Sequence, residues 1–211
     1  MKNNLILKGL YPISSNNYVS DLDFIEKTVT IIKSGIKIFQ FRGKYLSFKR
    51  KKYLLKTIHE NCQKNEVQLI INDDYNIVKY LEGSGLHIGQ NDINLKKIRK
   101  YFGNKIIIGK SCYNSLEMSI MAEKDGANYV SFGSIYETKS KKNFNICNPE
   151  TIVNAKKNLK IPICLIGGIN INNIKEVIKY NPNMISMISG IYDYNDILLN
   201  IKKINKMMKY D

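Results

Sequence analysis

Short apolar runs alternate with longer segments whose apolar residues recur at helical spacing, and the alternation repeats along the whole chain. Runs of the first kind predict buried strands, and the helical period predicts amphipathic helices. The predicted strands cover 7–13, 37–41, 68–71, 85–88, 105–109, 128–132, 162–166 and 184–188. The predicted helices cover 23–34, 47–64, 74–82, 94–102, 115–125, 148–158, 171–180 and 195–208.

Polar residues and glycines at the ends of these segments support the same division. Asp23 with Glu26 predicts a capping box at the start of the first helix. Asn94 and Ser115 are suitable N-caps, and Gly103 follows a helix as a C-terminal stop.

Eight consecutive strand–helix units within 211 residues predict the α/β class, as a single (β/α)8 TIM-barrel domain over residues 1–211. A doubly wound open sheet is the competing arrangement. That fold normally has a glycine-rich phosphate turn after its first strand. Residues 14–17 read SSNN at that place, which favours the barrel.

The composition narrows the classes of partner. The net charge is +15, but only three of the 33 basic residues are arginine, the residue that reads bases and phosphates in a bidentate manner. A solvated lysine surface is therefore expected, with no nucleic-acid partner. No apolar run approaches the roughly 18 residues of a membrane helix, and no secretory leader is recognisable, so we expect no membrane partner and a cytoplasmic location.

The four cysteines are widely spaced and form no CxxC pair, which argues against a zinc site or a disulfide framework. His87 lies within a predicted strand and is expected to be a satisfied core histidine rather than a base. His59 is the other histidine and lies in a lysine-rich helix, so the parts of a Ser–His–Asp triad are missing.

Polar residues gather where the predicted strands end, which is where TIM barrels place their active sites. Seven of the eight predicted strand ends carry a group that can bind a phosphate, a metal or a polar ligand. In chain order these groups are Gln40, Arg42 and Lys44; Asn72 and Asp73; Gln90 and Asp92; Ser111; Thr138, Ser140 and Lys141; Gly167 and Gly168; and Ser189 and Gly190.

Asp73 and Asp92 follow two successive predicted strands, so a barrel brings both carboxylates to the same end of the sheet. Mg²⁺ on a phosphorylated substrate is usually held by one or two carboxylates together with the phosphates. Helix capping is the alternative for each. Asp73 or its neighbour Asp74 can cap the helix over 74–82, and Asp92 can cap the helix over 94–102.

Gln40, Arg42 and Lys44 alternate and so share one face of an extended chain, where the two cations can meet a polyphosphate. The hydroxyls and the lysine of the ETKSKK segment at 137–142 suit a phosphate clamp. A solvated loop is the alternative for both segments. The glycines at 167–168 and residues 188–189 suit a phosphate bound through backbone N–H groups.

Taken together, these motifs resemble the thiamine-phosphate synthase (thiamine-phosphate pyrophosphorylase) family over essentially the whole chain. The resemblance rests on QFRGK at 40–44, INDD at 71–74, GLHIGQND at 85–92, IGKS at 108–111, YVSFGSIYETKSK at 129–141, IPICLIGGI at 161–169 and SMISGIY at 186–192.

The resemblance implies a transferase of a pyrimidinylmethyl (alkyl) group, which joins a pyrimidine diphosphate to a plain or carboxylated thiazole phosphate. By this likeness the pyrimidine diphosphate is bound by Gln40, Arg42, Lys44, Asn72, Ser111 and Lys141. Four of these, Arg42, Lys44, Ser111 and Lys141, are the candidate catalytic residues. The thiazole phosphate is bound by Thr138, Ser140, Gly168, Ile188 and Ser189, and the Mg²⁺ cofactor by Asp73 and Asp92.

The resemblance also implies small phosphorylated substrates, and it leaves open whether the protein is a homo-oligomer. Several positions depart from the family pattern: Gly43 replaces an acidic residue, Glu137 a proline and Ser140 a threonine. Tyr113 stands where a related family, the thiazole tautomerases, has a histidine for proton transfer. A tautomerase of the same barrel family, and a non-catalytic barrel that binds phosphorylated ligands, remain the alternative functions.

Overall fold

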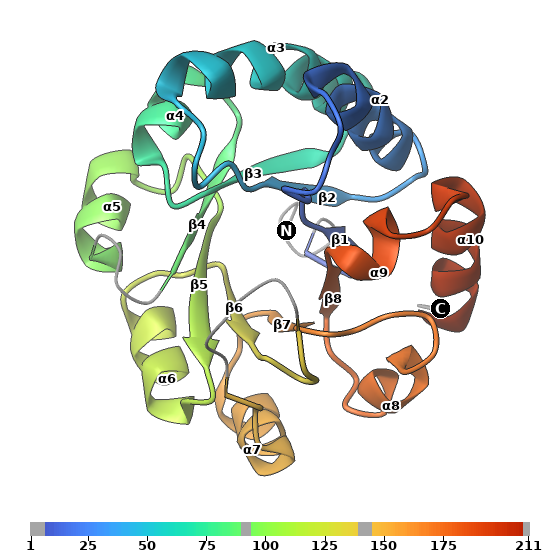
Figure 1. Cartoon of the computed structure of the whole chain (residues 1–211). Coiled ribbons are helices and arrows are strands. Elements are labelled where there is room, and N and C mark those ends of the chain that lie inside the picture. The colour runs from blue at the N-terminus through green and yellow to red at the C-terminus, as the bar shows by residue number, and fades with distance from the viewer. Residues whose placement is uncertain (1–6, 90–93, 139–144, 209–211) are drawn as a thin grey trace.

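The computed structural model describes residues 7–89, 94–138 and 145–208. Eight parallel strands form one sheet in the order β1-β8-β7-β6-β5-β4-β3-β2, and all helices except the short α9 (Ser189–Tyr192) are arranged as a ring outside it (Figure 1). The strands are β1 (Gly9–Pro12), β2 (Ile38–Phe41), β3 (Gln68–Asn72), β4 (Gly85–Ile88), β5 (Ile108–Tyr113), β6 (Tyr129–Phe132), β7 (Ile163–Ile166) and β8 (Met184–Met187).

The first seven helices of the described residues each connect two successive strands, and the last two follow β8. The helices are α2 (Asp21–Ile32), α3 (Phe48–Lys64), α4 (Tyr75–Tyr80), α5 (Leu95–Phe102), α6 (Leu116–Lys124), α7 (Pro149–Asn158), α8 (Ile174–Ile178), α9 (Ser189–Tyr192) and α10 (Ile197–Met208). Within the described ranges, no helix is long and apolar enough to cross a membrane.

The two end strands of the sheet meet and close the barrel. β1 pairs with β8 in register, and beyond β1 an isolated bridge joins Ile13 to Gln40 of β2. At the same seam the Ser14 backbone N–H donates to the Gln40 carbonyl oxygen at 2.8 Å. This closure confirms the predicted (β/α)8 barrel and excludes the open doubly wound sheet.

Most predicted elements agree with the structure within a few residues, but two local predictions are wrong. The capping box is one: α2 begins earlier, and its N-cap is Ser20, whose side chain accepts from the Asp23 N–H. The Asp23 carboxylate instead accepts from the Val19 N–H and forms an ion pair with Lys27. Asn94 and Ser115 are N-caps as predicted, and Gly103 ends α5.

The second wrong prediction concerns the fifth strand, which covers Ile108–Tyr113 instead of 105–109. Its pairing with β6 shifts register between Ser111 and Tyr113, and Tyr113 has a φ of 53°. Such a bulge lets a polar stretch continue as a strand. Ser111 therefore lies inside β5, not after it.

Alternation along the strands divides the apolar residues between two cores, as expected for parallel strands buried on both faces. The larger core lies between the sheet and the helices and includes Phe39, Val130 and Leu165. The smaller one fills the inside of the barrel. Its members are Leu7, Tyr11, Ile38, Ile70, Ile107, Tyr129, Cys164 and Met184.

Tyr129 is one of two tyrosines in the inner core of the barrel, and a glycine on the neighbouring strand leaves space for its ring. The side chain of Tyr129 is fully buried. A Cβ added to Gly109 of β5 would lie 2.0 Å from the Cζ atom of the Tyr129 ring. The packing of β5 against β6 therefore depends on the missing side chain at position 109.

We expect Gly109→Ala to lower the free energy of unfolding by about 3 kcal/mol, because the added methyl group overlaps the buried Tyr129 ring. Urea denaturation would measure the loss. Gly35→Ala is the control: Gly35 has a φ of 88° and no atom within 4 Å of an added Cβ. The Gly35→Ala variant should lose only about 1 kcal/mol of unfolding free energy, the cost of a left-handed backbone at a residue with a side chain. Equal losses in the two variants would contradict the packing role of Gly109.

Candidate functional site

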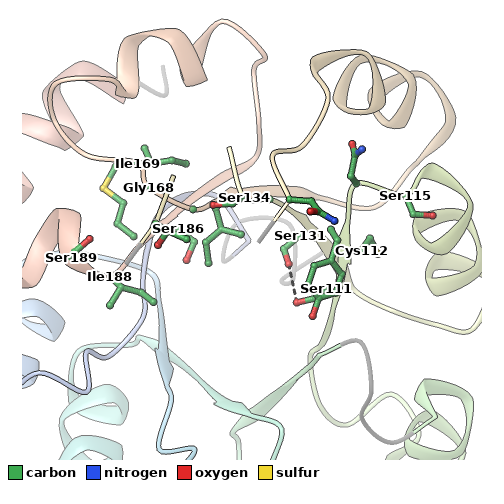
Figure 2. A pocket seen from close by; sticks show the side chains of 18 of the residues that line it. Ser111, Cys112, Ser115, Ser131, Ser134, Gly168, Ile169, Ser186, Ile188 and Ser189 are labelled. Carbon is green, nitrogen blue, oxygen red and sulfur yellow. Dashed lines mark hydrogen bonds between the residues drawn. The ribbon is translucent and has the colours of Figure 1, made fainter. Parts of the chain in front are cut away.

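A cavity of about 660 Å³ opens at the carboxyl ends of β5 to β8. Five residues predicted to bind substrate line it: Ser111, Thr138, Gly168, Ile188 and Ser189. Ser111 and Ser131 lie on one wall, and Ser186, Ile188 and Ser189 lie on the other (Figure 2). The fold therefore brings together groups that lie up to about 78 positions apart in the sequence, as parallel barrels do at their catalytic end.

Ser111 is held in place on the cavity wall by two hydrogen-bond partners. Its Oγ lies 2.9 Å from Nε2 of His87 and accepts from the Ser131 hydroxyl at 3.5 Å. His87 comes from β4 and Ser131 from β6, so the strands on both sides of β5 orient this hydroxyl.

Gly168 brings the segments after β6 and β7 together. It has a φ of 63°, and an added Cβ would lie 2.3 Å from the Glu137 carbonyl oxygen. Only glycine allows this close approach of two backbones. As a result, Thr138 lies at the same cavity as Gly168. Ser140 and Lys141, the other predicted members of this clamp, lie outside the described residues.

Ile188 and Ser189 enter the cavity from the end of β8, and Ser189 is the first residue of the short helix α9. The next residue, Gly190, packs against the chain after β7: an added Cβ would lie 2.3 Å from the Ile169 carbonyl oxygen. Asn200 of α10 donates its side-chain N–H to the Gly190 carbonyl oxygen at 2.8 Å. These contacts fix the turn on which Ser189 lies.

Ser186 is a cavity residue that the sequence interpretation missed. It is buried in β8, and its Oγ finds no hydrogen-bond partner among the described residues. A buried hydroxyl of this kind is rare and suits a ligand that supplies the partner. The sequence shows only that Ser186 is the polar member of the apolar strand MISM, not whether its hydroxyl has a partner.

Arg42 and Lys44, the two predicted cationic residues within the described ranges, follow the end of β2 and do not line this cavity. The Arg42 backbone N–H donates to Ser14 Oγ at 2.8 Å. In the orientation that satisfies both of its ends, the Asn16 side-chain amide donates to the Arg42 carbonyl oxygen and accepts from the Arg42 guanidinium, both at 3.1 Å. Lys44 is exposed on the following turn. Gln40, the third residue of this face, is buried inside the barrel.

Asp73 is fixed between the ends of β3 and β4. Its carboxylate accepts from Nδ2 of Asn72 at 2.6 Å and from the Gly89 N–H at 2.9 Å. Its own N–H donates to the His87 carbonyl oxygen at 2.9 Å, and its φ is 60°. Non-glycine residues with such a φ concentrate at functional sites.

The helix-capping alternative for Asp73 is wrong, because the neighbouring Asp74 fills that role. Asp74 accepts from the Ile77 N–H as the N-cap of α4 and pairs with Lys51 of α3 at 2.7 Å. The N-cap of α5 is Asn94. Gln90 and Asp92 lie outside the described residues.

The donor set at Asp73 fits Mg²⁺. Mg²⁺ prefers oxygen ligands and usually keeps several water or phosphate ligands beside one or two carboxylates. Asp73 offers two carboxylate oxygens in a partly buried position, while Lys51 neutralises Asp74. In the described part of the chain, no group of three or more His, Cys, Asp and Glu residues is arranged to hold a metal.

His87 is a satisfied core histidine, as predicted. It is buried, and its Nδ1 lies 2.8 Å from the Tyr129 hydroxyl. The four cysteines are free and buried. Burial raises the pKa of the Cys112 thiol to about 12, so very little thiolate forms near neutral pH and a nucleophilic role for this cavity residue is unsupported.

Comparison with known proteins places this site in a family. The family model described as thiamine monophosphate synthase matches residues 10–191. A thiamine-phosphate synthase from Pelagibacter ubique is 35% identical over 92% of this chain and 93% of its own length. The enzyme of that name from Nitrosomonas eutropha is 33% identical over 90% of each chain.

The three-dimensional comparison agrees. The structure of a thiamine phosphate pyrophosphorylase from Pyrococcus furiosus superposes with a TM-score of 0.86 at 25% identity, covering 99% of this chain and 98% of the other. A 3-hexulose-6-phosphate synthase gives a TM-score of 0.69 at 14% identity and shows the shared barrel alone. From the family model and the extent of these alignments, the chain belongs to the thiamine monophosphate synthase family, and through it to the transferases.

Proposed function

We propose that this protein forms thiamine phosphate from a pyrimidine diphosphate and a thiazole phosphate, with release of diphosphate. One observation carries the proposal. The cavity at the carboxyl ends of β5 to β8 is lined by Ser111 and by four of the five residues predicted to bind the thiazole phosphate, in a chain of the thiamine monophosphate synthase family. The substrates are small phosphorylated molecules.

The reaction begins with departure of diphosphate from the pyrimidine methylene group. The C–O bond breaks, diphosphate keeps the electron pair, and the electron-rich aminopyrimidine stabilises the resulting cation. In our proposal, Arg42, Lys44 and Lys141 bind the leaving group and neutralise its growing charge. Asn72 and Gln40 complete the binding of this substrate, and Ser111 contributes a hydroxyl from the cavity wall.

Asp73 and Asp92 would hold Mg²⁺, which supplies further positive charge to the diphosphate when bound. The structure supports the Asp73 part of this assignment. Its carboxylate is fixed by Asn72 and by the Gly89 N–H, so it needs little rearrangement on binding.

The second substrate, the thiazole phosphate, is bound by Thr138, Ser140, Gly168, Ile188 and Ser189 in our proposal. Its ring nitrogen attacks the methylene cation and forms the new C–N bond. Where the thiazole is carboxylated, CO₂ leaves after this step. Holding both partners at the same end of the barrel replaces an encounter in solution by a reaction between aligned groups.

This chemistry depends on charge stabilisation and alignment, and it needs no strong base from the protein. Such a site agrees with the observed side chains, since His87 has partners at both ring nitrogens and the four cysteines are buried. The hydroxyl and backbone groups around the cavity can bind a phosphate without taking part in proton transfer.

The purified protein should convert the two precursors to thiamine phosphate and diphosphate in equal amounts, with Mg²⁺ present. Excess EDTA should abolish both products, and added Mg²⁺ should restore them, because the departing diphosphate loses its counter-charge without the metal. A coupled diphosphate assay with chromatography of thiamine phosphate measures both. Folded protein that makes neither product would refute the proposal and direct the assay to aromatisation of the thiazole tautomer.

Two adjacent carboxylates provide a matched test of the metal assignment. Asp73→Asn should lower kcat about 100-fold, because a preorganised charge at the diphosphate is lost. Asp74→Asn should keep kcat near the wild-type value, since asparagine can still cap α4 and only the Lys51 ion pair is lost. Steady-state kinetics over a range of Mg²⁺ concentrations would separate the two. Equal effects at both positions would contradict the role of Asp73.

Arg42→Lys should raise KM for the pyrimidine diphosphate about tenfold, because lysine keeps the charge but loses the planar fork that binds phosphate oxygens. The control is Arg50→Lys, which changes a surface arginine paired with Asp21. That variant should leave KM unchanged. Unaltered KM in Arg42→Lys would remove Arg42 from the diphosphate site.

A further inference from the structure

A continuous chain of hydrogen bonds crosses the inside of the barrel from β2 to the cavity. Gln40 donates its side-chain N–H to the Tyr11 hydroxyl at 2.7 Å, and the hydroxyls of Tyr11 and Tyr129 lie 2.8 Å apart. The Tyr129 hydroxyl lies 2.8 Å from Nδ1 of His87. Nε2 of the same ring lies 2.9 Å from Ser111 Oγ.

The two tyrosines in the middle of this chain keep their protons. Tyr11 is 1% exposed and Tyr129 is 0% exposed. Burial raises the pKa of each phenol well above its usual value, because the phenolate would be desolvated. Each hydroxyl therefore has one proton to donate and can accept hydrogen bonds from its other neighbours.

Because each phenol has only one proton to donate, the direction of every hydrogen bond in the series is determined. The Tyr11 oxygen accepts from Gln40, so its proton is donated to the Tyr129 oxygen. Tyr129 must then donate its own proton to the other partner, which is Nδ1 of His87. A nitrogen that accepts carries no hydrogen, so the proton of the neutral ring is on Nε2 and is donated to Ser111.

Ser111 lies at the end of this series of hydrogen bonds, where its Oγ is an acceptor and not a donor. Its Oγ accepts from His87 and also from the Ser131 hydroxyl. Two acceptor positions are thereby filled, and the Ser111 proton is left for a group outside the chain. Ser111 lines the cavity, so that group is a ligand there.

We propose that Gln40, Tyr11 and Tyr129 fix His87 as the Nε2–H tautomer and thereby make Ser111 a hydrogen-bond donor to an anionic oxygen in the cavity. Tyr11, Tyr129 and His87 are positioning residues in this arrangement, because none of them lines the cavity. The role in turnover rests on the proposed function. There the acceptor is an oxygen of the departing diphosphate, whose charge grows as the C–O bond breaks.

The tautomer can be measured without any assay of activity. The protein has two histidines, so ¹⁵N labelling of histidine gives two sets of ring signals. A His59→Gln variant shows which set belongs to His87. We expect the His87 signals at neutral pH to show a protonated Nε2 and an unprotonated Nδ1. A protonated Nδ1 would mean that His87 donates to Tyr129, so that the hydrogen bonds point away from Ser111, and it would overturn the proposal.

The variant Tyr11→Phe tests how the direction is imposed. Without the Tyr11 hydroxyl, Tyr129 is free to reverse, so the His87 ring signals should move toward those of a mixture of tautomers. Retention of the wild-type signals would show that Tyr11 does not impose the direction. In the enzyme assay, Tyr11→Phe should lower kcat about tenfold and leave KM unchanged, as for one misdirected hydrogen bond.

A double-mutant cycle shows whether Tyr11 acts through Ser111. In a Ser111→Ala background, Tyr11→Phe should have no further effect on kcat, and additive losses would overturn the proposal. Tyr192→Phe is the matched control. Tyr192 is also a buried phenol, and its hydroxyl forms a hydrogen bond with Thr28 Oγ1 at 3.2 Å. The Tyr192→Phe variant should keep the wild-type kcat.

The two sets of measurements separate failure of this inference from failure of the proposed function. Wild-type protein that lacks synthase turnover would refute the function, and the ring signals would still test the direction of the chain. Active protein with a protonated Nδ1 would refute the inference alone.

Discussion

The packing of one tyrosine in the barrel interior is the constraint on which the rest of the structure depends. The Tyr129 ring occupies the space that Gly109 leaves open, and its hydroxyl lies where water cannot reach it. A buried phenol needs hydrogen-bond partners, and here they come from β1 and β4. One of these partners, His87, also contacts both site residues: its Nε2 lies 2.9 Å from Ser111 Oγ, and its carbonyl oxygen accepts from the Asp73 N–H at 2.9 Å.

Charge is distributed unevenly over that end of the barrel. The β2–β4 side carries the ionic groups Arg42, Lys44 and Asp73, whereas the described lining of the β5–β8 cavity consists of hydroxyls, amides, glycines and apolar groups. In our proposal the diphosphate and its metal occupy the first side and extend to Ser111 on β5, and the aromatic ring with a single phosphate occupies the second. The site is thus divided in a way that matches a reaction between one highly charged and one less charged substrate.

Much of the fold could be predicted from the sequence because parallel strands buried on both faces appear as short apolar runs. The errors occurred where local signals competed. The run Ile106–Ile108 was assigned to the strand, but β5 continues through Ser111 to Tyr113 across a bulge. At α2, an acidic residue that suited a cap lies inside the helix, because Ser20 supplies an earlier one.

The sequence predicted which strand ends carry polar residues, but not which partner each of these residues has. Asp73 and Asp74 are neighbours with the same chemistry, and only the folded structure shows that Asp74 caps α4 and pairs with Lys51 of α3. Ser186 was missed because a single serine in an apolar strand carries no sign of being unsatisfied.

The hydrogen-bond chain was also beyond prediction, because its links join residues 29, 118, 42 and 24 positions apart. Each hydrogen bond has one proton, so the donor role of the Gln40 amide fixes the donor and acceptor at every later bond, through the two phenols and the His87 ring to Ser111. Apolar side chains would fill the same volume but could not fix the direction of a hydrogen bond at Ser111. This difference gives a physical reason for polar groups in the centre of the barrel, where their burial must otherwise be compensated bond by bond.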